Sequence, residues 1–400
     1  METKISNKKA LIALAVGGFG IGLTEFVIMG ILPDVAKGLN ITIPEAGHFI
    51  AAYALGVVVG APLLTRFSSK MDSRMILLLL MGWFTLFNTL SGFATNYSTL
   101  LVTRFLSGLP HGAFFGIGAV VAGKLAKEGK AARAIAVMFT GLTIANVIGV
   151  PIGTYIGHHY DWSISFFMVG IVGVLAVLSV FLWMPQLESE KPKPYSKENK
   201  GLKNGELWAM ILLTTIGTGG FFAWYSYIAP LITDIAGWGE YMVGYAMILA
   251  GLGMVFGNFI GAKMAEIFSP IKAVAISLSI MVILLLINSV LAFNPYIVLG
   301  MTFFVGMAAF TVSTPIQMAI INTSKGNEML GSSMNQSAFN MGNASGAYLA
   351  GLPMTFGFSV VYAGVVGAFL AGMGVLMAVG IIVYRRHKAG YSFRKMAFNN

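Results

Sequence analysis

Apolar runs of about 20 residues, separated by short polar breaks, repeat along the whole chain. A helix needs roughly that length of apolar sequence to cross the hydrocarbon core of a bilayer, so each run predicts one membrane-spanning helix. Proline, glycine, asparagine and charged residues mark the breaks, as at Asn294-Pro295. Twelve spans are predicted, at 10–33, 46–66, 74–94, 98–123, 131–157, 162–184, 206–232, 240–263, 270–293, 296–321, 328–355 and 359–384.

The basic residues lie almost entirely on one side of these spans. Of 25 lysine and arginine residues, 23 fall at the N-terminus, after even-numbered spans or at the C-terminus, which leaves Lys37 and Arg104. Positive loops stay in the cytoplasm, so both termini are expected there. The net charge of +10 therefore reports topology and attraction to lipid headgroups, and it does not indicate nucleic-acid binding.

Composition agrees with an all-α membrane protein. Hydrophobic residues make up 57% of the chain and charged residues only 10%, too few to cover a soluble domain of 400 residues. Cysteine is absent, which excludes disulfides and thiol chemistry. No nucleophile–base pair or metal-ligand cluster is visible, so neither an enzyme nor a metal or other cofactor is expected.

An internal repeat predicts how the spans are organised. A constant shift of 197 residues aligns glycine, proline and asparagine positions in both halves, including Gly20/Gly217, Pro33/Pro230, Gly56/Gly253, Gly60/Gly257 and Asn146/Asn343. We expect two pseudo-symmetric six-helix bundles, 1–186 and 206–400 with a short cytoplasmic tail, joined by a polar cytoplasmic linker at 187–205. Two bundles facing each other across a midplane site is the layout of an alternating-access transporter.

Two charged residues, Glu25 and Arg104, lie well inside spans. Glu25 is eight residues below Pro33, which is expected to end the first span, or about 12 Å of helix rise; Arg104 is six residues, or about 9 Å, below the outer start of the fourth. Charges at this depth cost at least ~2.5 kcal/mol and usually face a water-filled cavity or each other. A purely structural ion pair is the alternative. His111 is seven residues from Arg104 and so lies on nearly the same face of the fourth span. It is either a proton relay or a neutral, hydrogen-bonded histidine.

Five stretches carry a resemblance to a known family: TEFVIMGILP, AGHFIAAYALGVVVGAP, RFLSGLPHGAFFGIGA, ANVIGVPIGTYIG and FAWYSYIAP. Over essentially its whole length the chain resembles the major facilitator superfamily, and within it the twelve-spanning drug–proton antiporters. The resemblance implies the major facilitator fold and proton-driven export of arabinose-like sugars or small amphipathic drugs. It also implies proton coupling through Glu25 and Arg104, to which the position of His111 adds a third candidate, and an antiporter motif in the fifth span at Gly149, Pro151, Gly153 and Gly157.

The residues of the fifth span support a hinge or close-packing role. Gly149, Gly153 and Gly157 recur every four positions and so line one helix face, where a neighbouring backbone can approach. Pro151 removes one intrahelical hydrogen bond and adds a bend. Ordinary small-residue packing, unrelated to transport direction, is the alternative.

The loop after the second span departs from the family pattern. Gly60 leads into APLLTRFSSKMDSR without the acidic residue that the superfamily usually carries there. Arg66, Lys70 and Arg74 keep the positive character and Asp72 lies further on. These five residues form the predicted cytoplasmic gate. Because the acidic residue is missing, the gate is not expected to be held closed in the way that is usual in the superfamily.

Polar and aromatic faces predict the substrate cavity. Gln336, Asn340 and Asn343 form one polar stripe in the eleventh span, while Trp224, Tyr227 and Gln317 come from the seventh and tenth. Helix–helix hydrogen bonding and interfacial anchoring are the alternative roles. The predicted cavity comprises Tyr53, Phe114, Asn146, Trp224, Tyr227, Gln317, Gln336, Asn340 and Asn343.

Three functions follow as hypotheses. The first is a proton-coupled exporter, in which Glu25 binds a proton when the outside opens and loses it when substrate binds from inside. The others are a proton-coupled importer and a non-transporting membrane sensor. The expected partners are a small-molecule substrate, protons and lipid, for a monomer in the bacterial inner (plasma) membrane.

Overall fold

The computed structural model describes residues 7–41, 43–68, 71–186, 204–239 and 241–397, and its regular elements within these ranges are helices. The long helices of the first half are α1 (Asn7–Gly30), α3 (Ile43–Ser68), α4 (Ser73–Gly92), α5 (Tyr97–Leu125), α6 (Ala131–Ile144) continued by α7 (Val150–His159), and α8 (Trp162–Trp183). Those of the second half are α10 (Gly205–Tyr225), α12 (Tyr241–Phe268), α13 (Pro270–Leu291), α14 (Pro295–Thr323), α15 (Glu328–Thr355) and α16 (Tyr362–Ala397). Short elements are α2 (Leu32–Gly38), α11 (Ile228–Pro230) and the π-helical turns η1 (Ala145–Gly149) and η2 (Leu231–Ile235).

The twelve long helices match the twelve predicted spans. In the described part of the chain, eleven are both long and apolar enough to cross a membrane. The twelfth, α15, has 28 residues but carries the polar stripe, which lowers its mean hydropathy. Its amide and hydroxyl groups are buried inside the bundle, where protein groups satisfy them instead of lipid.

The first predicted span differs from the structure at its outer boundary. Helix α1 ends at Gly30, and Pro33 lies in the first turn of α2 instead of ending α1. Proline is tolerated there because its missing N–H has no intrahelical partner in a first turn. The predicted linker from 187 to 203 and Lys70 lie outside the described residues.

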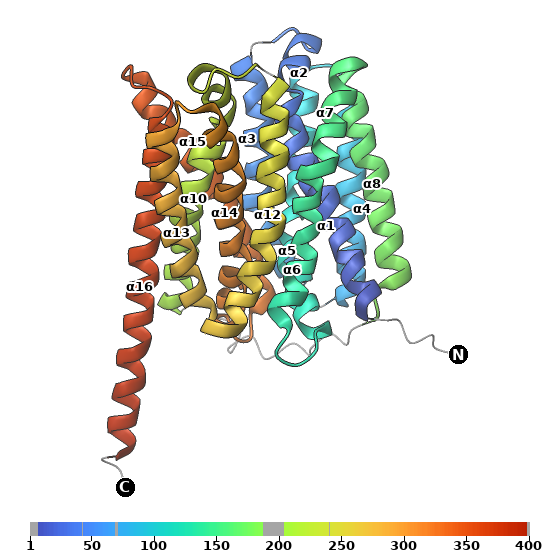
Figure 1. The fold of residues 1–400 in the computed structure, drawn as a ribbon. Helices are drawn as coiled ribbons and strands as arrows, with labels where there is room; N and C mark the ends of the chain where they lie inside the picture. The colour runs from blue at the N-terminus through green and yellow to red at the C-terminus, as the bar shows by residue number, and fades with distance from the viewer. Residues whose placement is uncertain (1–6, 42, 69–70, 187–203, 240, 398–400) are drawn as a thin grey trace.

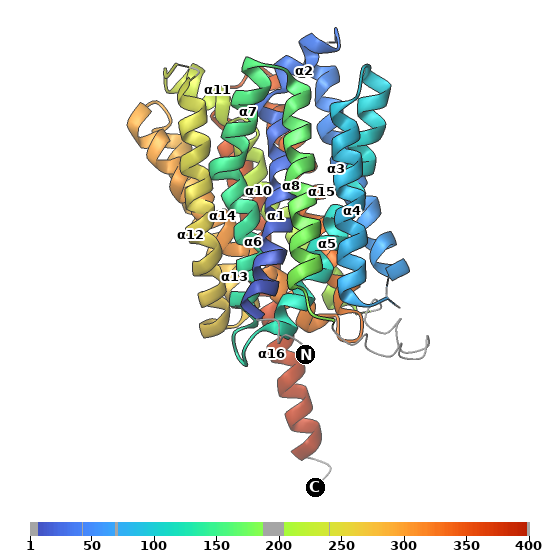
Figure 2. The same cartoon turned by 90° about the vertical axis from the view of Figure 1, so that its right-hand side faces the viewer.

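The helices run side by side in two groups, with α1–α8 largely to the right and α10–α16 largely to the left in Figure 1. Helix α1 begins and α16 ends at the same end of the bundle, which we call the termini end, and α16 extends beyond the other helices there (Figures 1 and 2). The two groups meet where α15 packs against α3 and α5, and where α12 packs against α6.

Equivalent glycines pack both halves in the same way. A Cβ atom at Gly60 of α3 would lie 2.1 Å from the backbone oxygen of Leu109 in α5, so only glycine allows this approach. A Cβ atom at Gly257 of α12 would lie 2.0 Å from the backbone oxygen of Met307 in α14. Because Gly60 and Gly257 are 197 residues apart, the repeat in the sequence corresponds to the same helix–helix contact in each bundle.

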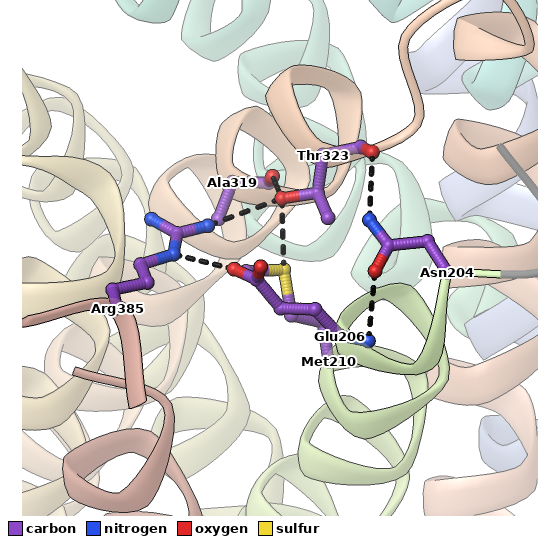
Figure 3. Close-up of polar contacts among 6 residues, drawn as sticks. All are labelled: Asn204, Glu206, Met210, Ala319, Thr323 and Arg385. Carbon is purple, nitrogen blue, oxygen red and sulfur yellow. Dashed lines mark hydrogen bonds and ion pairs between the residues drawn. The ribbon is translucent and has the colours of Figure 1, made fainter. Parts of the chain in front are cut away.

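A polar cluster fixes the start of the second half at the termini end (Figure 3). Arg385 Nε donates to Glu206 Oε1 at 2.5 Å, and its Nη2 donates to Thr323 Oγ1 at 3.1 Å. Asn204 caps α10 by accepting from Glu206 N and donates to the Thr323 carbonyl at 3.4 Å. The start of α10 and the end of α14 are therefore both tied to α16 at Arg385, directly after the linker.

Candidate functional site

A narrow cavity lies between the two bundles, near the middle of the long helices, with about 60 Å³ open to the centres of water-sized molecules. Its wall combines aromatic and polar groups. The aromatic ones are Phe26, Phe139, Phe221, Phe222, Phe310 and Phe339, and the polar ones are Glu25, His111, Thr218, Ser313, Gln336 and Asn340. Such a mixture of apolar surface with a few convergent polar groups is typical of small-molecule sites.

Among the residues that the structure describes, Glu25 is the only acidic one that lines this cavity. Helix α1 holds it with 9% of its surface exposed, and its carboxyl group makes no hydrogen bond or ion pair with other described residues. A carboxyl group in this position borders open space and a wall rich in phenylalanine. It is free to bind a proton or a ligand.

Arg104 is fully buried beside Glu25 but forms its hydrogen bonds with Thr24, the residue that precedes Glu25 in the sequence. Its Nη1 donates to Thr24 Oγ1 at 2.8 Å and its Nη2 to the Thr24 carbonyl at 3.3 Å. The Thr24 hydroxyl in turn donates to Asn88 Oδ1 at 2.5 Å. Arg104 also lies over the rings of Tyr53, at 4.4 Å, and Phe166, at 5.5 Å.

The direct ion pair suggested by the sequence is therefore not formed. Successive helical residues point about 100° apart, so the guanidinium that engages Thr24 faces a different direction from the Glu25 carboxyl group. The structure brings both charges to one level, as the helix rise predicted, but directs Glu25 toward the cavity and holds Arg104 behind the wall.

His111 and Tyr53 form a hydrogen-bonded pair at the wall. His111 lines the cavity, and its Nδ1 lies 3.1 Å from the Tyr53 hydroxyl. Tyr53 is not among the lining residues and connects the ring of His111 to the Arg104 guanidinium. The arrangement leaves Nε2 of His111 as the atom available to the cavity.

The predicted amides divide into two groups. Gln336 and Asn340 line the cavity, whereas Gln317 is completely buried behind them on α14. Asn343, three residues beyond Asn340, is half-buried and outside the lining set. Asn146 is buried in η1 against Gly251 of α12, and its amide donates to the Leu142 carbonyl at 3.1 Å.

The remaining predicted cavity residues lie in the packed interior. Phe114 packs against α1, where a Cβ atom at Gly17 would lie 2.2 Å from its ring. Trp224 is buried between Phe221 and the ring of Tyr225. The Tyr227 hydroxyl donates to the Ala347 carbonyl at 3.2 Å, which links the turn after α10 to α15.

Sequence reasoning missed the six phenylalanines, Thr218 and Ser313. Thr218, Phe221 and Phe222 occupy one face of α10, so a helical register could have grouped them once one member was known. No signal distinguishes the phenylalanines beforehand, because every span is rich in large apolar side chains.

The antiporter-motif residues pack against the helix that carries Glu25. A Cβ atom at Gly153 would lie 2.6 Å from Val27 of α1, and one at Gly157 would lie 2.6 Å from Ile31, the residue directly after α1. Gly149 faces the same helix at Phe19. Pro151 lies in the first turn of α7, directly after η1, where the Val150 N–H bonds to the Ala145 carbonyl in a π-helical pattern. The predicted bend is therefore a π-helical turn, which accommodates the missing proline N–H.

The predicted gate residues make contacts within the first bundle. Gly60 packs on Leu109, and Asp72 caps α4 by accepting from Arg74 N and Met75 N. Arg74 donates to the Phe181 carbonyl at the end of α8 and lies over the Phe181 ring. Arg66 is exposed near the end of α3.

Contacts between the two bundles occur elsewhere at the termini end. Thr65 Oγ1 donates to Ser333 Oγ at 2.7 Å, joining α3 to α15. Lys130 Nζ lies 3.2 Å and Arg133 Nη2 4.0 Å from Glu266 Oε2, joining the start of α6 to the end of α12. We call these two groups of contacts the closing contacts.

Comparison with known proteins identifies the family. The sequence profile of the Major Facilitator Superfamily matches residues 14–351. The chain belongs to this superfamily. Among superfamily relatives, AraJ of Escherichia coli (strain K12) is 37% identical over 384 residues, which cover 96% of this chain and 97% of AraJ. The inner membrane transport protein YdhP of Escherichia coli (strain K12) is 39% identical over 367 residues, with 92% and 94% of the two chains covered.

The superfamily fold is also found in a solved structure. The transporter FucP in the outward conformation superposes with a TM-score of 0.76 at 15% identity, covering 93% of this chain and 98% of FucP. At that identity the likeness concerns the fold alone. As a member of the Major Facilitator Superfamily, the chain is a multi-pass membrane transporter and not an enzyme.

Proposed function

We propose that this transporter is a proton-coupled exporter, an antiporter that exchanges protons for a small amphipathic drug or a sugar. The observation that carries the proposal is Glu25, a buried carboxyl group that lines the cavity and makes no hydrogen bond or ion pair with other described residues. Dry surroundings favour the protonated form of a carboxyl group, whereas water or a nearby positive charge favours the carboxylate. A change in access to the cavity thereby changes the proton affinity of the site.

The two bundles, 1–186 and 206–400, alternate around this cavity in the proposed cycle. When the outside opens, Glu25 takes a proton and substrate leaves; when the inside opens, Glu25 loses the proton as substrate binds. Arg104 supplies the nearby positive charge, and Thr24 holds it in place. The glycines of α7 allow α1 to shift without opening a wide gap, because α7 itself contributes no side chain where Val27 of α1 packs against Gly153.

The closing contacts support an outward-facing arrangement. They join the bundles at the termini end, which the distribution of basic residues assigns to the cytoplasm. The similarity to FucP in its outward conformation agrees with this assignment. We further propose that the chain lies in the bacterial inner membrane, as its similarity to the inner membrane transport protein YdhP suggests, and that it acts as a monomer with both termini cytoplasmic.

Transport by purified protein in liposomes tests the proposal. With an imposed pH gradient, an exporter accumulates substrate on the acidic side, whereas a symporter accumulates it on the alkaline side. Glu25→Gln should abolish the gradient-driven component and retain exchange of labelled for unlabelled substrate. Gradient-driven transport that survives Glu25→Gln would overturn the proposed role of Glu25, and accumulation on the alkaline side would establish import.

A further inference from the structure

Most polar groups of the cavity wall turn hydrogen-bond acceptors toward the cavity, and the proposed function does not depend on this property. Two amides of α15, Gln336 and Asn340, face the cavity together with Glu25. Each amide has an N–H₂ donor and a carbonyl acceptor, so its contacts outside the cavity decide which of the two it offers to a ligand.

Asn340 offers its oxygen. Its Nδ2 donates to the backbone carbonyl of Gln336 at 3.1 Å. A backbone carbonyl only accepts hydrogen bonds, so it fixes the amide with nitrogen toward the helix. Oδ1 of Asn340 has no partner among the described residues and remains for the cavity.

Gln336 is held in the same sense by Gln317. Gln317 Nε2 donates to Ser332, at 3.4 Å to its backbone carbonyl and also to its hydroxyl, which directs Gln317 Oε1 toward α15. That oxygen accepts from Asn335 Nδ2 at 2.5 Å and from Gln336 Nε2 at 3.3 Å. One N–H of Gln336 is thereby engaged outside the cavity, and its Oε1 is left to face a ligand.

The other polar groups add to this pattern. Thr218 donates its hydroxyl hydrogen to the Thr214 carbonyl at 2.7 Å, so it presents only lone pairs. Glu25 presents carboxyl oxygens. Among the described lining residues, the donors left for the cavity are His111, Ser313 and the second N–H of each of the two amides. The wall therefore mainly accepts hydrogen bonds, next to the one ionisable acid.

Aromatic rings form most of the remaining wall. The faces of aromatic rings attract cations and also bury apolar bodies. An anion would meet acceptor oxygens and the Glu25 carboxylate, and a sugar would leave the phenylalanine faces poorly covered. A ligand with an aromatic or alkyl body and a positively charged N–H donor group satisfies both kinds of surface.

We propose that the transported ligand is a protonated amphipathic amine and that Gln317 is the positioning residue that gives the wall its acceptor character. This inference rests on the proposed transport function of the same cavity. Gln317 does not line the cavity, so it acts through Gln336. Without it, the Gln336 amide can rotate and offer its N–H₂ group instead.

A series of probes with one body separates charge from hydrogen bonding. The purified full chain is titrated by calorimetry with 4-phenylbutylammonium, its N,N,N-trimethyl analogue, 4-phenylbutanol and 4-phenylbutyrate. The two cations share charge and ring but differ in N–H donors. We expect the primary ammonium to bind about tenfold more tightly than the trimethyl analogue, and the carboxylate to bind weakest.

Variants then test the role of Gln317. Gln317→Leu should reduce the ratio of the two cation affinities to near one, whereas Gln317→Glu retains an acceptor oxygen and should keep the ratio. Ser345→Ala is the matched control on α15, because its hydroxyl bonds only within its own helix. A merely structural role of Gln317 would lower all affinities together and leave the ratio unchanged.

Equal binding of both cations by the unmodified chain, tightest binding of the carboxylate, or no binding of any probe would overturn the inference. These outcomes are distinct from failure of the proposed function. A sugar or an anion that displaces a proton from Glu25 would leave the exporter intact and refute only the amine.

Discussion

At the scale of single residues, the site depends on a buried charge with several partners. Arg104 has no exposed surface, and Thr24 accepts from both of its terminal nitrogens while donating to Asn88. The guanidinium is thereby kept away from direct pairing with Glu25. A buried charge that loses a partner keeps the full cost of its desolvation.

Thr24→Val should therefore destabilise the protein strongly. It removes a hydroxyl that serves two neighbours and leaves Arg104 Nη1 and Asn88 Oδ1 without partners, at a cost of about 1–3 kcal/mol. Thermal unfolding in detergent measures the loss. Thr103→Val on α5 is the control, because its hydroxyl bonds within its own helix and its loss should change stability little. Equal melting temperatures for the two variants would contradict the account.

The sequence was sufficient to find the two charges but not their partners. Glu25 and Arg104 stand out because ionisable residues are rare in apolar spans. Thr24 and Asn88 do not stand out, because threonine and asparagine also occur in spans as local helix-bonding residues. Which of them meets a charge depends on how α1, α4 and α5 pack, and a helical pattern does not contain that information.

At the scale of elements, small residues determine which helices approach closely. The repeat of 197 residues predicted equivalent glycines, and the structure gives them equivalent contacts between α3 and α5 and between α12 and α14. The π-helical turn before Pro151 was not predictable, because proline in a helix can be accommodated by a kink, a π-helical turn or a break. The packing of α7 on α1 selects among them.

Gly60→Ala should be poorly tolerated because its Cβ atom would overlap the backbone of Leu109, which cannot move as a side chain can. We expect a loss of about 1–3 kcal/mol or more in stability. Gly47→Ala on the same helix is the matched control, since a Cβ atom at Gly47 would meet no other atom within 4 Å. That substitution should be neutral or stabilise the helix by up to about 1 kcal/mol. Melting temperatures that fall equally would refute the packing role of Gly60.

At the scale of the whole molecule, the closing contacts join the two bundles at the termini end. The Glu266 side chain is only 10% exposed and pairs with Lys130 and Arg133 across the two bundles. Around it, Ala132, Ala136, Ala262 and Ala265 pack in a small apolar cluster. None of these contacts could be predicted from the sequence, because they join residues more than 120 positions apart on helices that look alike.

Glu266→Gln should shift the protein toward the conformation that opens at the termini end. The chain has no cysteine, so a single cysteine at Ala136 reports access to the closed region by its rate of maleimide labelling. We expect labelling to rise about threefold, as for the loss of an interaction of ~0.7 kcal/mol. Glu128→Gln, an exposed residue of the neighbouring loop, is the control. Unchanged labelling in Glu266→Gln would mean that the ion pair does not hold the bundles together.

The measurement that tests the central claim most directly is proton release from the purified protein in weakly buffered detergent solution as candidate amines, sugars and drugs are added. If Glu25 exchanges a proton for substrate, at least one compound should release protons from the unmodified chain and none from Glu25→Gln, while binding to the variant is checked by calorimetry. Release that persists in Glu25→Gln, or binding without release in the unmodified chain, would contradict the account.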